Sequence, residues 1–264
     1  MKRREFLRSA TLAGGAVMAG GAARAGATEG DGREFYELRV YETNLGARKR
    51  VLDDYLERAF IPALNRAGSS PVGAFNVIAG ASSLALYLLV PFPTLDALVS
   101  APARLAADPE YVKAAEPCLS APIDDPAYVR YESSLLRAFA EAPRVRVPAE
   151  TAAKQPRLFE LRTYESHSER AALRKIEMFN EGGEIALFDR LGLRSVFFGQ
   201  TLMGRRQPNL VYMTVHRDQA ARDRSWAEFS ASPDWKRLSS DPAFANTVSA
   251  QHIVFLRPAA YSQI

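Results

Sequence analysis

The architecture of this chain is decided by the octapeptide Phe35-Tyr36-Glu37-Leu38-Arg39-Val40-Tyr41-Glu42, which returns as Leu158-Phe159-Glu160-Leu161-Arg162-Thr163-Tyr164-Glu165. Five of the eight positions are identical, and Glu160 lies 123 positions after Glu37. In both copies, apolar or aromatic residues alternate with polar ones, which predicts a β-strand with two different faces. The octapeptide therefore predicts an internal duplication in which each half opens with the same strand.

The alternation places a polar trio on one face of each predicted strand, because successive side chains of a strand point to opposite faces. The first trio is Glu37, Arg39 and Tyr41. The second trio is Glu160, Arg162 and Tyr164. We predict that the apolar neighbours face the helices of their own half, so that both trios face the space between two sheets.

Both halves are predicted to follow the order strand, helix, strand, strand, helix, strand. In the first half the strands and the first helix fall at residues 35–42, 48–66, 74–79, 84–90 and 128–137, and the second helical region begins near Thr94 and ends before Pro122. In the second half they fall at residues 158–165, 168–191, 194–201, 210–216 and 252–257, with the second helix lying between the last two of these strands. This order is that of the ferredoxin-like split βαβ unit, with two helices on one face of a four-stranded antiparallel sheet. The predicted fold class is α+β: two tandem ferredoxin-like βαββαβ repeats that pack sheet to sheet as an intrachain α/β barrel.

Proline and glycine predict interruptions inside three of these helices. Pro62 and Pro102 should each kink or break a helix of the first half. Gly182-Gly183 should break the first helix of the second half. The second helix of that half is expected to begin near Ser225-Trp226.

Four segments follow from this pattern: a leader at residues 1–27, a first repeat at 34–137, a linker at 138–156 and a second repeat at 157–264. The linker holds Pro143, Pro148 and Pro156 without a sustained apolar period.

The leader carries all of the chain's formal charge of +4, through Lys2, Arg3, Arg4, Arg8 and Arg24 against Glu5. The remainder is formally neutral and has no polybasic run, which argues against a nucleic-acid partner. Paired arginines, a weakly apolar Ala/Gly-rich run and small-x-small patterns ending at Ala25 and Ala27 resemble a twin-arginine export signal. We therefore expect the twin-arginine translocase as an export partner, a periplasmic or extracellular mature protein, and no stable transmembrane segment after cleavage.

With both halves laid out, the chain resembles the NIPSNAP family. The resemblance is carried by the opening Tyr-Glu-Leu-Arg-x-Tyr strand, a helix ending in Gly68 or Gly192, and the turns Asp108-Pro109-Glu110-Tyr111 and Ser232-Pro233-Asp234-Trp235. It covers residues 34–137 and 157–257 and implies the dimeric α/β-barrel fold. No defined biochemical activity comes with it, and the first repeat departs from the family pattern at Leu86-Tyr87-Leu88 and Tyr111.

The two polar trios are the candidate ligand-binding residues. An arginine fork suits a carboxylate, and a glutamate perturbed by burial could act as a base. The alternative is that each Glu–Arg pair simply satisfies itself within the fold, because buried charges need partners whatever the function.

The sequence predicts no metal site and no cofactor. His167, His216 and His252 form no pair at metal-ligand spacing, and no predicted helix carries a histidine that could bind haem. Cys118 is the only cysteine, has no neighbouring base in the sequence, and is expected to be a buried structural thiol. Trp226, Phe229 and Trp235 are expected to be core residues.

Three classes of function remain open on the sequence alone. The first is a protein that binds a small organic ligand, anionic or aromatic, between its two sheets. The second is an enzyme similar to the cofactor-free monooxygenases or isomerases of α/β-barrel proteins. The third is a non-catalytic structural or interaction module, and a homo-oligomer is compatible with each.

Overall fold

Eight antiparallel strands close into one barrel within residues 31–43 and 47–264, which are the residues that the computed structural model describes. The strands are β1 (Phe35–Glu42), β2 (Gly73–Ala79), β3 (Ala85–Phe92), β4 (Arg130–Ala138), β5 (Leu158–Glu165), β6 (Ser195–Met203), β7 (Asn209–His216) and β8 (Ala250–Pro258). Their order around the barrel is β1-β3-β2-β8-β5-β7-β6-β4, and β4 pairs with β1 to close it. The predicted export signal, residues 1–27, lies outside the described residues.

The two repeats join along two seams of backbone hydrogen bonds. Strand β2 pairs with β8, and β4 pairs with β6. In the part of the chain that the structure describes, both edge strands of each four-stranded sheet therefore pair with edge strands of the other sheet. The prediction of an α+β fold built from two ferredoxin-like repeats that pack as an α/β barrel is confirmed.

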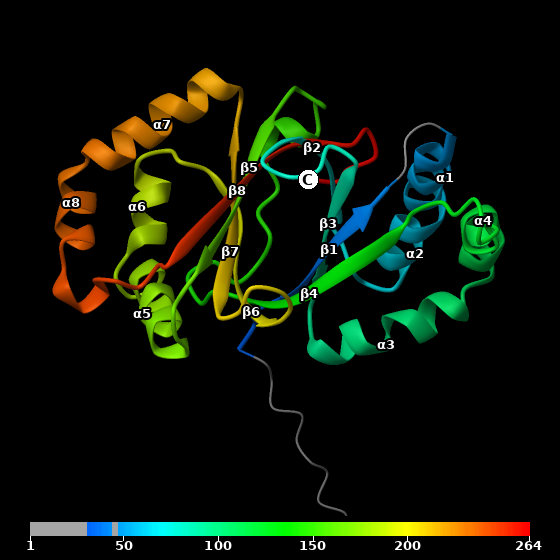
Figure 1. Ribbon diagram of the computed structural model, residues 1–264, viewed down its shortest axis with the longest axis horizontal. Coiled ribbons are helices and arrows are strands. Elements are labelled where there is room, and N and C mark those ends of the chain that lie inside the picture. Colours follow the sequence, from blue (N-terminus) through cyan, green and yellow to red (C-terminus); the bar gives the residue numbers. More distant parts are fainter. Residues whose placement is uncertain (1–30, 44–46) are drawn as a thin grey trace, which may run out of the picture. The chain divides into compact units, whose positions relative to one another are not determined.

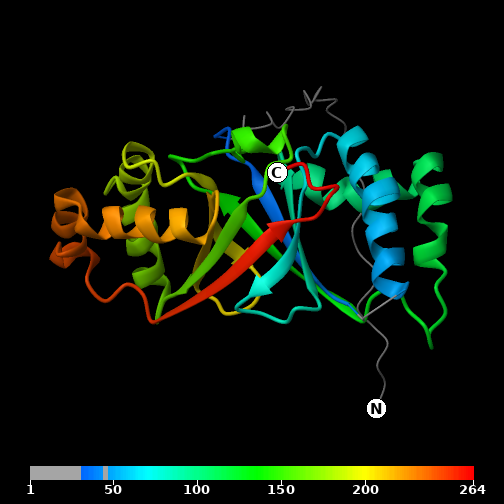
Figure 2. The ribbon, with the colours of Figure 1, turned by 90° about the horizontal axis from the view of Figure 1, so that it is seen from above.

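The helices form two groups on opposite sides of this barrel (Figures 1 and 2). The first repeat supplies α1 (Ala47–Tyr55), the π-helical turn η1 (Leu56–Phe60), α2 (Ile61–Arg66), α3 (Leu95–Ala106) and α4 (Pro109–Leu119). The second supplies α5 (Glu169–Phe179), α6 (Glu184–Arg190), α7 (Gln219–Ala231) and α8 (Pro233–Ser239). Short 3₁₀ turns occur at η2 (Ala149–Thr151) and η3 (Pro242–Phe244). Among the described residues, no helix combines the length and the apolar character needed to cross a membrane.

The barrel interior is apolar, and this corrects the predicted orientation of the opening strands. Tyr36 and Leu38 pack inside the barrel with Phe159 and Leu161 of the other repeat. The two polar trios therefore face the helices of their own repeats and not the space between the sheets. The physical reason is that the closed interior offers a charged group neither water nor an oppositely charged partner, whereas the helix layer can supply both.

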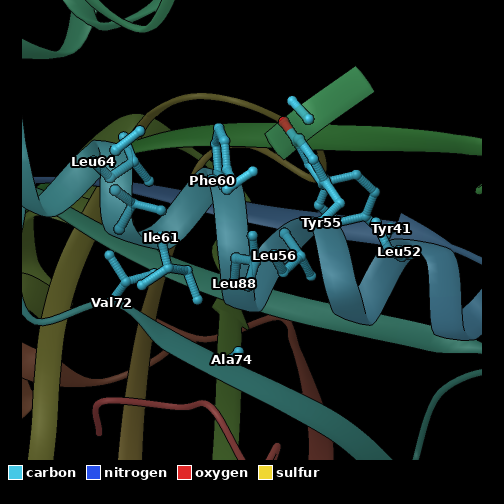
Figure 3. Close-up of a cluster of buried hydrophobic side chains, with 14 of the residues drawn as sticks. Tyr41, Leu52, Tyr55, Leu56, Phe60, Ile61, Leu64, Val72, Ala74 and Leu88 are labelled. Atoms are coloured by element: carbon cyan, nitrogen blue, oxygen red, sulfur yellow. The ribbon is translucent and has the colours of Figure 1, made fainter. Parts of the chain in front are cut away.

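The first helix of the first repeat is interrupted as predicted, by a change of helical period. Just before Pro62, the backbone N–H of Ile61 donates to the carbonyl of Leu56, which is the i→i−5 bond of a π turn. Proline lacks an N–H and crowds the preceding turn, so a local change of helical geometry accommodates it. Figure 3 shows Phe60 and Leu64 projecting from this helix in the same cluster as Tyr41 and Tyr55.

The remaining helix predictions are partly right. Gly183 adopts a left-handed conformation (φ +82°) at the start of α6, which explains the break after α5. Helix α3, by contrast, continues through Pro102 and ends at Ala106. Helix α7 begins at Gln219, six residues before the predicted start, because Asp218 caps it by accepting from the N–H of Ala221 at 2.8 Å.

Candidate functional site

The first polar trio forms a connected hydrogen-bonded group on the helix-facing side of β1. Arg39 Nε donates to Glu37 Oε1 at 2.9 Å, and Arg39 Nη2 donates to Glu37 Oε2 at 3.0 Å. Arg39 Nη1 donates to the hydroxyl of Tyr41 at 3.0 Å, and Ser133 Oγ of β4 donates to Glu37 Oε1 at 2.6 Å. Glu37 and Arg39 therefore pair with each other, as in the second of the two alternatives left open by the sequence.

The guanidinium of Arg39 also lies against two aromatic rings. Its central carbon is 4.5 Å from the ring centre of Tyr131 and 4.9 Å from that of Phe60. Burial alone would favour the neutral guanidine, but Tyr41 and Glu37 outweigh it and raise the pKa of Arg39 above its ordinary value. Arg39 is thus a fixed cation, held in a fork by Glu37.

A cavity of about 670 Å³ opens over this trio, between the sheet and the helices of the first repeat. Its walls are mainly apolar and aromatic, and include Tyr55, Phe60, Leu98, Pro102, Tyr111 and Tyr128. Glu37 and Arg39 are each 14% exposed, so both reach the cavity without reaching bulk water freely. A concave, mostly apolar space with a few polar groups at its base is the usual form of a small-molecule site.

Tyrosine hydroxyls supply further polar contacts in this cavity. The hydroxyls of Tyr55 and Tyr111 are 3.0 Å apart, and the ring of Tyr41 packs edge-on against that of Tyr128 with centroids 5.0 Å apart. Burial raises the pKa of Tyr41 to about 12, despite the opposing effect of Arg39. Burial also raises the pKa of Tyr55 and of Tyr128. These phenols remain protonated at neutral pH and can donate hydrogen bonds to a ligand.

The second polar trio has the same internal contacts but is closed by its helices. Arg162 Nε donates to Glu160 Oε1 at 2.7 Å, and Arg162 Nη1 donates to the hydroxyl of Tyr164 at 2.9 Å. Arg222 of α7 donates to both oxygens of Glu160, at 2.9 and 2.8 Å. Trp226 of α7 donates through its indole N–H to Glu160 Oε2 at 2.8 Å. The side chain of Glu160 is fully buried as a result.

These helix contacts also set the charge state of the second trio. Burial would raise the pKa of Glu160, but Arg222, Arg162 and Trp226 together lower it below its ordinary value. The ring of Trp226 stacks on the guanidinium of Arg162, with the central carbon 3.8 Å from the ring centre. In the second trio, both carboxylate oxygens of Glu160 therefore accept hydrogen bonds from side chains of the same repeat.

Arg222 and Trp226 were not identified as site residues from the sequence, although the duplication contains the signal. The N-cap residues Thr94 and Asp218 begin α3 and α7 and lie 124 positions apart. The same spacing aligns Arg222 with Leu98 and Trp226 with Pro102, both of which line the cavity of the first repeat. Helix α7 thus closes the second trio, whereas its counterpart α3 leaves the first trio open.

The two repeats also differ in the size of paired side chains on the helix-facing side of the sheet. Phe198 and Tyr212 are paired across β6 and β7 and stack with ring centres 5.4 Å apart. The residues paired at the matching positions of β2 and β3 are Ala74 and Leu88. At these matching positions the second repeat therefore carries the larger side chains, while Ala74 and Leu88 are themselves fully buried.

The other candidate residues of the sequence lie apart from the cavity. His216 is buried beside Thr214 in the second repeat, and His252 lies 2.6 Å from Glu165 near the end of β5. Cys118 is buried in the first-repeat core, as expected of a structural thiol. Phe229 is buried in the core of the second repeat, as predicted, whereas Trp226 and Trp235 are half-buried and pack against that core. Within the described part of the chain, no three His, Cys, Asp or Glu residues are grouped so as to hold a metal ion.

Comparisons with known proteins agree with this architecture. The family model described as NIPSNAP matches residues 36–124 and 159–263, one match in each repeat. No curated protein matches the chain.

Among solved structures, the fold is similar to that of two candidate monooxygenases. One, from Lactobacillus acidophilus NCFM, is 10% identical over 85% of this chain and 94% of its own, with a TM-score of 0.56. The other, from Fusobacterium nucleatum subsp. nucleatum ATCC 25586, is 9% identical over 86% of this chain and 92% of its own, with a TM-score of 0.52. A NIPSNAP-like domain protein from Burkholderia xenovorans is 21% identical over 40% of this chain and 88% of its own, with a TM-score of 0.37. For the two structures with TM-scores above 0.5, the likeness at these identities shows a shared fold.

Proposed function

This chain belongs to the NIPSNAP family, and we propose that its first repeat binds a small, flat aromatic molecule in the cavity over Glu37 and Arg39. The observation that carries the proposal is the contrast between the repeats. The same trio lies under a cavity of about 670 Å³ in the first repeat and under Arg222 and Trp226 in the second. The proposed site lies between sheet and helices, which replaces the earlier expectation of a site between the two sheets.

The walls of the cavity support an aromatic ligand. Tyr55, Phe60, Tyr111 and Tyr128 present ring faces and edges, and aromatic pairs gain about 0.5–1.5 kcal/mol beyond the apolar area that they bury. The Glu37–Arg39 pair and the tyrosine hydroxyls provide polar groups that can orient such a ligand.

A variant that fills the cavity tests this function. Pro102→Trp places, on α3, the side chain that α7 carries at the equivalent position 226. Val99→Trp is the matched control, because Val99 lies on the same helix and is 68% exposed. Protein purified from its own host and examined by native mass spectrometry should retain a small molecule as wild type and as Val99→Trp, and lose it as Pro102→Trp. Equal retention by all three proteins would contradict the proposal.

A catalytic role for the same cavity is the second candidate, as in a cofactor-free monooxygenase or isomerase. The observation that favours it is Glu37, a carboxylate at the base of an enclosed aromatic space that could accept a proton from a bound phenol. The similarity of the fold to that of two candidate monooxygenases also supports a catalytic role. Oxygen consumption with simple phenols, lost in Glu37→Gln, would support this role. Ligand binding without turnover would leave binding as the function.

We further propose that the protein is exported by the twin-arginine route, on the strength of Arg3-Arg4 and the small-x-small patterns that end at Ala25 and Ala27. Replacing Arg3 and Arg4 by lysine should leave uncleaved precursor in the cytoplasm, which fractionation and immunoblotting would detect. Unchanged export of that variant would contradict the assignment.

A further inference from the structure

In the second repeat, side chains of α7 occupy the space over Glu160 and show which chemical groups can hydrogen-bond to the glutamate of a trio. Glu160 Oε1 accepts from Arg162 and Arg222, and Glu160 Oε2 accepts from Arg222 and Trp226. The groups that close the site are thus a cationic nitrogen fork and an aromatic N–H, presented side by side from one helix.

The first repeat lacks both of these groups. Glu37 Oε1 accepts from Arg39 and Ser133, but the only donor to Glu37 Oε2 among the described residues is Arg39 Nη2. Glu160 Oε2 has two donors, and both come from the helix. Glu37 Oε2 therefore keeps an acceptor position that corresponds to one filled by Arg222 or Trp226 in the second repeat.

The charges and rings of the cavity favour a cation at that position. Among the described residues that line it, Glu37 and Glu116 are acidic and Arg39 is basic, so the lining carries one net negative charge. The ring of Tyr128 lies in the cavity wall, with its centroid 5.0 Å from that of Tyr41 and 6.1 Å from that of Tyr131. Arg39 already lies over the rings of Tyr41 and Tyr131, so the ring of Tyr128 is the one of the three that can face a second cation. The negative faces of such rings attract a positive nitrogen.

We infer that the ligand of the first repeat is an aromatic molecule with a positively charged nitrogen, such as an aryl amidine or aryl amine, whose N–H groups donate to Glu37 Oε2. Its cation takes the place that Arg222 occupies in the second repeat, and its ring takes the place of Trp226. This inference rests on the proposed binding function and specifies its ligand class. It departs from the anionic ligand that an arginine in the trio would suggest, because Arg39 is already committed to Glu37.

Three probes of nearly equal size and shape test the ligand class: benzamidine, which is cationic, benzamide, which is neutral, and benzoate, which is anionic. Isothermal titration calorimetry with the folded protein should show benzamidine binding at least tenfold more tightly than benzoate. Glu37→Gln should reduce this preference about tenfold, because the charged acceptor is replaced by a neutral amide.

A second variant keeps the test valid if Glu37→Gln fails to fold. Leu98→Arg installs on α3 the arginine that α7 carries at position 222, and it should weaken benzamidine binding at least tenfold. Val99→Arg adds the same charge to an exposed position of the same helix and should bind as wild type does. Circular dichroism would verify that each variant is folded.

The outcomes separate the two proposals. If benzoate binds as tightly as benzamidine, and Leu98→Arg weakens both, the cavity binds aromatic ligands but the cationic class is wrong. If no probe binds to the wild type and no host molecule is retained, the binding function itself fails. Benzamidine binding that Leu98→Arg leaves unchanged would place it outside this cavity and overturn the inference.

Discussion

Arg222 of α7 donates to both carboxylate oxygens of Glu160, through Nε at 2.9 Å and Nη2 at 2.8 Å. The residue at the corresponding place of the first repeat is Leu98, which lines an open cavity over Glu37. This helix position, together with that of Trp226 and Pro102, therefore distinguishes a closed ion cluster from an accessible one within the same duplicated fold.

The first prediction concerns the stability that Arg222 provides. Arg222→Leu should lower the free energy of unfolding by about 3 kcal/mol, because Glu160 is fully buried and keeps only part of its charge compensation from Arg162. Urea denaturation would measure the change. Arg217→Leu is the control, since Arg217 and its partner Asp218 are 74% and 48% exposed, and it should cost less than about 1 kcal/mol. Equal losses in the two variants would contradict the role of Arg222.

The second prediction concerns the buried ion pair of Lys175 and Glu184, whose nitrogen and oxygen lie 2.8 Å apart. Lys175→Met alone should cost about 3–5 kcal/mol, because Glu184 remains in a site where burial already raises the pKa of its carboxyl. Adding Glu184→Leu should recover most of that loss, because it removes the buried carboxylate that Lys175→Met leaves unpaired. A double-mutant cycle by chemical denaturation would show the coupling, and additive losses would contradict it.

The third prediction concerns pH and His216, whose pKa burial lowers to about 4, with Arg222 and Arg194 adding to the effect and Glu160 opposing it. The unfolded chain binds a proton at this residue near pH 6.5, and the native state does so only near pH 4. Stability should therefore be complete above pH 6.5 and fall as the pH drops toward 4, by on the order of 3 kcal/mol.

Replacing His216 isolates this contribution from that of the carboxylates. His216→Phe, which installs the residue found at the equivalent Phe92, should flatten the fall in stability between pH 6.5 and 4.5. Carboxylates with lowered pKa, such as Glu160, lose their contribution only below that window. Denaturation curves at half-unit pH steps would provide the comparison, and parallel profiles for the two proteins would refute the assignment.

The fourth prediction concerns the reactivity of Cys118. Burial raises the pKa of this thiol to about 11, so its thiolate fraction at pH 8 is about a hundredfold below that of an ordinary thiol. Iodoacetamide should therefore label the native protein at least a hundredfold more slowly than the protein in denaturant. Mass spectrometry over time would follow the modification, and comparable rates in the two conditions would show that the thiol is accessible.

The duplicated octapeptide and the repeated order of elements after it together predicted the architecture. Alternation from Phe35 to Glu42 and again from Leu158 to Glu165 identified two equivalent strands, and the order of elements between them identified the ferredoxin-like repeat. These signals are local, because strand period, turn residues and capping residues such as Asp108 act over a few neighbouring positions. The residues of the two trios could be predicted because the alternation of side chains along a strand is also a local signal.

The face that each trio occupies could not be read from the alternation. Alternation along a strand separates its two faces but does not indicate which face enters the barrel. Tyr36 and Tyr41 lie on opposite faces, and both are buried. The start of α7 was misplaced for a related reason: its first turns are polar, and the side chain of Asp218 sets the helix start.

The sequence by itself determined the duplication, the α+β class and the residues of the two trios, but left open whether each glutamate pairs with the arginine of its own strand. Only the tertiary structure decided that the trios face the helices, and that Arg222 and Trp226 close one while Leu98 and Pro102 leave the other open. The physical reason is distance along the chain. Glu160 and Arg222 are 62 residues apart, and their contact exists only once the helix packs on the sheet.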